Sequence, residues 1–227
     1  MSRAGFDWLT VDMEHSAITV DSAQELIRVI DLCGVVPLVR VGEKNPALIK
    51  RVMDAGAHGV IVPMINSVSE AEMAVSSVKY PPVGTRGVGL ARAQEYSLDF
   101  EKYRKWAQEE TIVVIQIEHI AAVERLDEIL SVPGVDAFSV GQYDLSGSLG
   151  IPGQFEHPQF LETLDQIRRV AAKAPAAKGY HVVPPQPQLV IDKIKDGYTF
   201  IAYSDDFLFL GESCRDGVKT IRSGLRG

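Results

Sequence analysis

The sequence predicts an α/β protein of the (β/α)8 type, a TIM barrel. Short runs of apolar and β-branched residues alternate along the chain with stretches of helical length and periodicity. Several of these runs stop at a charged residue, as the first one does in FDWLTVDMEH, residues 6–15. No segment of the 227-residue chain has the composition of a linker, so we expect one barrel domain over residues 1–227.

Turn and cap residues set the boundaries of the first three strand–helix units. The first helix has Asp21 or Ser22 as its expected N-cap and Gly34 as its stop, and Asn45 before Pro46 opens the second. In order, the predicted elements are a strand at 6–15, a helix at 20–33, a strand at 35–42, a helix at 46–55, a strand at 58–65, and a helix capped by Asn66 or Ser67 that runs to 80.

The second half of the chain begins with YPPVGTRGVGLARAQEY, residues 80–96. Paired prolines and several glycines cannot continue a helix or a strand, so we expect a long surface loop that borders a pocket. The remaining predicted elements are helices at 98–109, 121–134, 157–173, 186–196 and 207–224, and strands at 111–118, 135–144, 179–183 and 198–206.

These predictions give seven strands, whereas a closed barrel of this type has eight. Residues 1–4 resemble the tail of a helix that lacks its strand. We therefore expect a barrel that lacks its first strand–helix unit at the N-terminus.

Composition excludes several classes of protein. Hydrophobic residues make up 46% of the chain and charged residues 23%, which is typical of a globular protein with a large core. The net charge is −7 and the sequence contains no run of basic residues, so nucleic acid is not expected as a partner. No apolar run approaches the roughly 20 residues of a membrane span. Cys33 and Cys214 fit no metal or redox spacing, and we expect buried thiols in a cytoplasmic protein.

Five residues with reactive side chains are predicted at the end of a strand or in the turn just after it: Glu14, His15, Arg40, Glu118 and Asp144. Glu118 and Asp144 together suit a hard divalent cation, with water and substrate oxygens as its other ligands. Arg40 offers a planar fork for a substrate carboxylate. His15 moves a proton near neutral pH, with Glu14 or Asp12 orienting it or its water. Such a set suits a reaction through an enolate.

Each candidate also has a structural interpretation. Glu118 or Asp144 alone is equally typical of a salt bridge or a helix N-cap, Arg40 of a buried ion pair, and His15 of a structural histidine. The glycine-rich GTRGVG, residues 84–89, is better explained as a turn than as an anion-binding nest. The other histidines carry no pairing signal and are expected to be structural: His58, His119, His157 and His181.

Six stretches carry a resemblance to a known family: DWLTVDMEH, PLVRV, NPALIKRVMDAGAHGVIVPM, KYPPVGTRGVGLARAQ, IQIEHIAAVERLDEIL and GVDAFSVGQYDLSGSLG. They resemble the HpcH/HpaI aldolases, metal-dependent class II pyruvate aldolases that include 4-hydroxy-2-oxoheptanedioate aldolase and 2-dehydro-3-deoxyglucarate aldolase. The resemblance covers nearly the whole chain. It implies a TIM barrel that is typically a hexamer, built as a trimer of dimers exchanging a C-terminal helix.

The resemblance also implies roles for individual residues. Mg²⁺, Mn²⁺ or Co²⁺ would be held by Glu118 and Asp144, Arg40 would contact the pyruvate carboxylate and oxo group, and His15 would act in acid–base chemistry through water. Two further roles follow from matching motifs: Gln116 binds pyruvate, and Asp54 is a catalytic acid at a subunit boundary near the site. The turn of Gly141, Gln142 and Tyr143 before Asp144 departs from the family, since many relatives have a proline and a small residue there, and we expect this turn to contact the substrate and Tyr143 to narrow the site.

The resulting hypothesis is a lyase that reversibly cleaves a 4-hydroxy-2-oxo acid to pyruvate and an aldehyde through a metal-stabilised enolate. Its partners would be these small molecules and further copies of the chain, with neither nucleic acid nor membrane. Three alternatives stay open: a class I aldolase with a Schiff-base lysine, a catalytically impaired oligomer that binds metal and 2-oxo acid, and a CoA-ester lyase like the citrate lyase β-subunit.

Overall fold

The computed structural model describes residues 1–225, over which the chain forms seven strands that alternate with helices. Each pairing between neighbouring strands is parallel. This is the predicted class, a TIM-type α/β barrel that lacks one unit. The chain divides into two compact units, Met1–Ala177 and a second unit from Lys178 onward, which are described separately. The expectation of a single domain stays a prediction.

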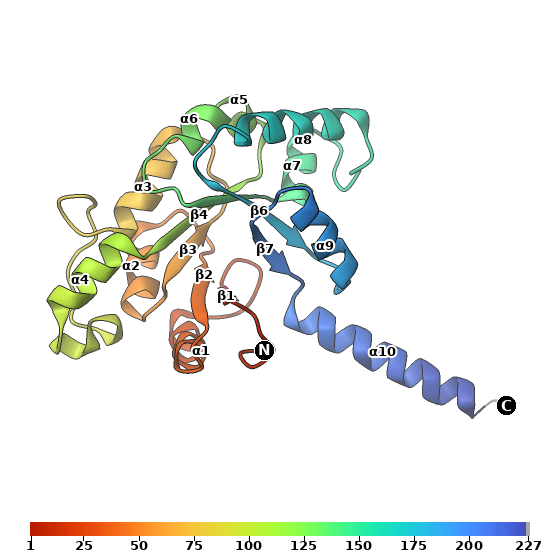
Figure 1. Cartoon of the computed structure of the whole chain (residues 1–227), viewed down its shortest axis with the longest axis horizontal. Coiled ribbons are helices and arrows are strands. Elements are labelled where there is room, and N and C mark those ends of the chain that lie inside the picture. Colours follow the sequence, from red (N-terminus) through yellow and green to blue (C-terminus); the bar gives the residue numbers. More distant parts are fainter. Residues whose placement is uncertain (226–227) are drawn as a thin grey trace. The chain divides into compact units, whose positions relative to one another are not determined.

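The first unit is a sheet of five parallel strands in chain order, with helices in the connections (Figure 1). Its elements are β1 (Trp8–Asp12), α1 (Val20–Leu32), β2 (Val36–Arg40), α2 (Pro46–Asp54), β3 (Gly59–Val62), α3 (Val68–Val78), the 3-10 helix η1 (Arg92–Ser97), α4 (Phe100–Glu109), β4 (Ile112–Ile117), α5 (Ile120–Glu124), α6 (Leu126–Leu130), β5 (Ala137–Val140), α7 (Gln142–Ser148) and α8 (Pro158–Ala171).

The two faces of this sheet differ in character. Residues such as Val39, Val60 and Ile115 join the large apolar core that also contains the helices. The alternate residues, among them Leu38 and Val114, are also buried but lie outside that core cluster, on the opposite face. The period of two therefore puts the last residues of several strands on this second face. Those residues are Asp12, Arg40 and Gln116, with Glu118 directly after β4.

Cap residues were predicted with mixed success. Asn45 caps α2 through its side-chain oxygen and Ser67 caps α3, as expected. The expectation for α1 is wrong, because Thr19 caps the amide of Ser22 instead. The helix predicted at 121–134 is two short helices, since the backbone of Arg125 departs from helical geometry (φ −121°, ψ 19°).

The segment 80–96 is not wholly a surface loop. The side chain of Arg86 is fully buried, and Tyr80 and Gln94 are also buried. Its last residues enter η1, and they border a cavity of about 540 Å³ together with His58 and Trp106. The expected turn lies just before GTRGVG: the structure has a turn at 81–83, closed by Gly84 N–H on the Tyr80 carbonyl at 3.0 Å, and residues 84–89 themselves are irregular.

The second unit contains β7 (Phe200–Tyr203), α9 (Pro187–Lys195), α10 (Asp206–Gly224) and most of β6 (Ala177–Val182). β6 and β7 pair in parallel, and neither helix has a buried residue.

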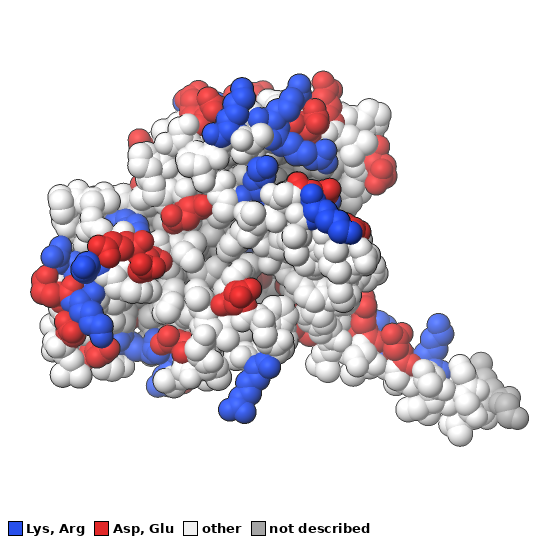
Figure 2. Space-filling model, viewed as in Figure 1, with Lys and Arg blue, Asp and Glu red and all other residues white. Residues whose placement is uncertain are grey.

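The expectation of buried thiols is wrong: Cys33 ends α1 and Cys214 lies on α10, and both are exposed. Lysines and arginines are interspersed with acidic residues on the face shown in Figure 2. Over residues 1–225, no helix combines the length and apolarity that crossing a membrane requires.

Candidate metal and oxo-acid site

Arg40 is held by two acids at the ends of β1 and β2. Asp12 is the register partner of Arg40, and its carboxylate accepts from Nε at 2.8 Å and from Nη2 at 2.7 Å. Glu14 Oε2 lies 3.3 Å from Nε. Burial opposes the charge of Arg40, but the two acids prevail and raise its pKa. Asp12 therefore occupies the edge of the guanidinium formed by Nε and Nη2. The other edge, formed by Nη1 and Nη2, is suited to binding a second carboxylate.

Asp12 and Glu14 respond differently to this environment. Burial raises the pKa of Asp12, but the hydrogen bonds from Arg40 and from the amide of Glu14 outweigh it, and the net pKa is lowered. Burial also raises the pKa of Glu14, and here the nearby charges of Arg40 and His15 do not overcome it. Glu14 Oε2 is buried and makes no hydrogen bond with any residue of the described chain. Asp12 therefore orients Arg40, while Glu14 faces His15.

Glu118 is the most perturbed acid of this group. It is 4% exposed, Met64 N–H donates to Oε2 at 2.8 Å, and Gln116 Nε2 donates to Oε1 at 3.0 Å. Burial raises the pKa of Glu118 to about 7, and the charges of Glu14 and Asp144 raise it as well. The close approach of β5 depends on a glycine, since a Cβ at Gly141 would lie 2.2 Å from Glu118 Oε1.

Asp144 lies in the first turn of α7, near enough for its charge to raise the pKa of both Glu118 and Glu14. Its interpretation as an N-cap is wrong, because Gly141 occupies that position. Within residues 1–225 no group of three or more His, Cys, Asp or Glu side chains is arranged to hold a metal ion. The two predicted acids nevertheless fit a hard divalent cation, since a cation would offset the repulsion among these carboxylates and satisfy their oxygens.

His15 is the exposed member of the group. Its side chain is 67% exposed, and Nε2 lies 3.7 Å from Glu14 Oε2. This position at the edge of the site leaves the imidazole open to substrate or water. The four remaining histidines have structural contacts, as expected: His119 and His157 cap helices, and His58 and His181 lie 3.5 Å and 3.7 Å from Asp31 and Asp205.

The turn before Asp144 brings an aromatic ring to the same end of the sheet. Gln142 and Tyr143 begin α7, and the ring of Tyr143 packs edge-on against Phe155 with 5.0 Å between centroids. Phe155 in turn contacts Phe160, which is 1% exposed. Tyr143 itself is 67% exposed. The core thus braces this ring at the protein surface beside the acid cluster.

Asp54 is not brought together with the other predicted residues. It ends α2, and the chain then leads directly into β3, so Asp54 lies near the starts of the strands, while the acid cluster lies at their ends. Its carboxylate accepts from Arg86 Nη2 at 2.6 Å and from Gln94 Nε2 at 3.3 Å. Within one chain Asp54 therefore anchors the segment 80–96.

Met64 is a contributor that the sequence analysis missed. Its main-chain N–H binds Glu118, and every residue except proline carries such a group, so no sequence pattern marks it. The positive φ of 54° that aims this N–H is equally unmarked, because glycine is the usual residue for that conformation.

A parallel barrel-type sheet with an arginine and several acids at the carboxyl ends of its strands has the arrangement of a TIM-type enzyme. The particular family follows from comparison with known proteins. The model of the HpcH/HpaI aldolase/citrate lyase family matches residues 1–210, and the chain belongs to this family.

Known relatives agree with this membership. The chain is 37% identical over 213 residues to 2-dehydro-3,6-dideoxy-6-sulfogluconate aldolase of Pseudomonas putida, an alignment that covers 92% of this chain and 82% of that protein. It is 40% identical over 187 residues to 2-keto-3-deoxy-L-rhamnonate aldolase of Klebsiella pneumoniae, covering 81% and 69%. The solved HpcH/HpaI aldolase of Desulfitobacterium hafniense matches with a TM-score of 0.86 at 36% identity, over 97% of this chain and 85% of that one.

Proposed function

We propose that this chain is a class II aldolase, an aldehyde-lyase that reversibly cleaves a 4-hydroxy-2-oxo acid to pyruvate and an aldehyde. The observation that carries the proposal is the grouping of Arg40, Glu14, Glu118 and Asp144 at the carboxyl ends of the strands. Relatives that are named as aldolases for 2-keto-3-deoxy acids support the reaction type.

Glu118 and Asp144 would hold the divalent cation, for which the candidates are Mg²⁺, Mn²⁺ and Co²⁺. When bound, the cation would supply positive charge that polarises the 2-oxo group and stabilises negative charge on its oxygen. Gln116 Nε2 donates to one oxygen of Glu118 and the Met64 amide donates to the other. These two donors fix the orientation of the carboxylate before any ligand arrives.

Arg40 would bind the carboxylate of the oxo acid. Its paired contact with Asp12 prevents rotation of the guanidinium, so the second edge is presented in one direction. Gly141, Gln142 and Tyr143 would contribute further contacts to the substrate, since they form the turn into α7 and Gly141 lies against Glu118.

His15 would accept the proton of the C4 hydroxyl, directly or through a water molecule. As the C3–C4 bond breaks, the aldehyde leaves and the bonding electron pair stays on C3 as the enolate of pyruvate. Return of a proton to C3 then completes pyruvate. Glu14 lies 3.7 Å from the imidazole and orients it toward the substrate during this transfer.

The class I alternative needs a free lysine at a strand end. Lys44 follows β2, but its ammonium donates to the Met64 carbonyl at 2.9 Å and pairs with Glu70. Treatment with borohydride and pyruvate separates the two classes, because only a Schiff-base enzyme gains mass irreversibly. Pyruvate binding without turnover over a panel of 4-hydroxy-2-oxo acids would identify the binding-protein alternative. Cleavage of a CoA ester alone would identify the citrate-lyase-like one.

Removal of the cation and of its ligand tests the proposal directly. We expect EDTA and Glu118→Ala each to abolish pyruvate release in a coupled assay, while Glu128→Ala, a change at an exposed acid on α6, leaves the rate unchanged. Full turnover by protein that EDTA has stripped would contradict the proposal.

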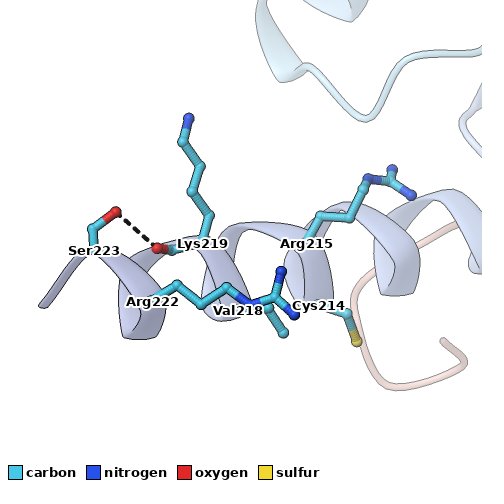
Figure 3. A pocket seen from close by; sticks show the side chains of 6 residues that line it. All are labelled: Cys214, Arg215, Val218, Lys219, Arg222 and Ser223. Carbon is cyan, nitrogen blue, oxygen red and sulfur yellow. Dashed lines mark hydrogen bonds between the residues drawn. The ribbon is translucent and has the colours of Figure 1, made fainter. Parts of the chain in front are cut away.

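Assembly into a homo-oligomer, for which a hexamer is the expectation, is part of the proposal, as is a cytoplasmic location. One face of α10 carries exposed apolar side chains, including Phe207, Leu210 and Ile221. Residues of this helix line a further hollow of about 520 Å³, among them Cys214, Val218 and Arg222. Figure 3 shows these side chains along α10. A second copy covering this face would remove the apolar surface from water. Light scattering that gives the monomer mass would contradict this part of the proposal.

A further inference from the structure

The peptide that binds Glu118 is held in a conformation that its side chain disfavours. Met64 follows β3 and has a φ of 54°, in the left-handed region that residues with a Cβ rarely occupy. In this conformation its N–H points to Glu118 Oε2 at 2.8 Å. Such a conformation persists only where the surroundings hold it, so the structure must contain the groups that do so.

Lys44 and Glu70 are among those groups, together with the Gln116 carbonyl, which accepts from Ile65 N–H at 3.2 Å. Lys44 Nζ donates to the carbonyl oxygen of Met64 at 2.9 Å and forms an ion pair with Glu70. The second carboxylate oxygen of Glu70 accepts from the Asn66 amide at 2.6 Å. The lysine comes from the loop after β2 and the glutamate from the first turn of α3, so the segment from Met64 to Asn66 is clamped from two different elements.

The Lys44–Glu70 pair is more than a surface ion pair. The two side chains are only 29% and 30% exposed, and burial opposes the charge of Glu70, yet the hydrogen bonds from Lys44 and Asn66 lower its pKa. Glu70 also serves the start of α3, because Ser67 caps the helix with its side chain and Glu70 binds the Ser67 main chain in return, whereas Lys44 takes no part in that cap. Its distinct contribution is the fixed position of the Met64 carbonyl.

We infer that Lys44 is a positioning residue: by holding the carbonyl group of Met64 it fixes the backbone angles of this residue, and with them the direction in which the Met64 N–H meets the carboxylate of Glu118. Lys44 acts through Met64 and does not touch the substrate. The consequence for catalysis rests on the proposed function, in which Glu118 holds the cation. The contact itself does not, because it involves only protein groups.

The first test is hydrogen exchange at the Met64 amide, measured by NMR on the full chain without added metal. In Lys44→Met we expect this amide to exchange at least about tenfold faster, because its peptide is no longer held against Glu118. Lys44→Arg keeps a cation that reaches Glu70, so most of the protection returns. The matched control is Lys50→Met, which changes an exposed lysine on α2 and leaves the Met64 amide protected.

The second test is Mn²⁺ affinity, measured by titration calorimetry. Groups that orient a metal ligand typically account for 10- to 100-fold in affinity, and we expect about tenfold weaker binding in Lys44→Met. The value of kcat should fall while KM for the oxo acid stays near that of the wild type, since Arg40 still binds the carboxylate. Adding Met64→Gly to Lys44→Met should recover part of the affinity, because glycine adopts a positive φ without strain.

The outcomes separate this inference from the proposed function. Unchanged exchange at the Met64 amide in Lys44→Met overturns the positioning role, whatever the enzyme catalyses. Faster exchange with unchanged Mn²⁺ affinity overturns the link between the clamp and the cation. A wild-type protein that binds no Mn²⁺ and releases no pyruvate contradicts the proposed function, and the exchange measurement still decides the role of Lys44.

Discussion

Replacing Glu118 by glutamine should stabilise the metal-free protein while removing its activity. The pKa of Glu118 is about 7 in the folded chain against an ordinary value of 4.5. Between these values the folded chain binds the proton more tightly than the unfolded chain, so the free energy of unfolding falls as the pH rises through this window. A difference of one in pKa corresponds to about 1.4 kcal/mol, and the full cost at pH 8 is therefore about 3 kcal/mol.

The amide of Glu118→Gln avoids this cost and keeps the local contacts. The Met64 N–H has a carbonyl oxygen to bind, and Gln116 is able to turn its amide, since its Oε1 is buried and makes no hydrogen bond with any described residue. We expect the variant to be up to about 3 kcal/mol more stable than the wild type at pH 8, with the difference vanishing near pH 4.

Urea unfolding between pH 4 and pH 8.5 measures this difference, with EDTA present so that bound cation does not stabilise the wild type. Glu128→Gln is the matched control, because Glu128 is exposed on α6 and lies away from the acid cluster. A stability difference that does not change with pH, or a less stable Glu118→Gln at pH 8, would refute the argument from burial and like charge.

Three further outcomes are expected. Arg40→Lys should weaken pyruvate binding in calorimetry by about tenfold, because the guanidinium makes two charge-assisted hydrogen bonds to a carboxylate and the ammonium of lysine makes one. Equal affinity would contradict paired binding of the pyruvate carboxylate by Arg40. Arg86→Met should lower the free energy of unfolding, measured in urea, by about 3 kcal/mol, since Asp54 loses its buried cation. An unchanged urea midpoint of unfolding would contradict this prediction. Asn45→Ala should cost about 1 kcal/mol, whereas Asp21→Ala, outside the true cap, should cost almost nothing.

Much of the fold was readable from local patterns. The order of the seven strands and the caps Asn45 and Ser67 follow from the period of apolar residues and from turn chemistry, which act over a few residues. The short helix α7 was missed, because the strand predicted at 135–144 ends at Val140. Some errors are local, such as the cap of α1, but others occur where a distant contact decides. Arg86 and Gln94 are buried because Asp54, more than thirty positions earlier in the chain, binds them, and a glycine-rich segment gives no local sign of that.

The same division holds for the site. The sequence by itself determined which side chains stand at the end of a strand or shortly after it, because apolar runs and the residues that end them are local features. It named Arg40, Glu118 and Asp144 on that basis. Only the tertiary structure decided that Asp12 takes one edge of Arg40, that burial among like charges raises the pKa of Glu118, and that Met64 supplies a main-chain donor. Burial and main-chain direction depend on how separate strands pack together, and no short stretch of sequence contains that information.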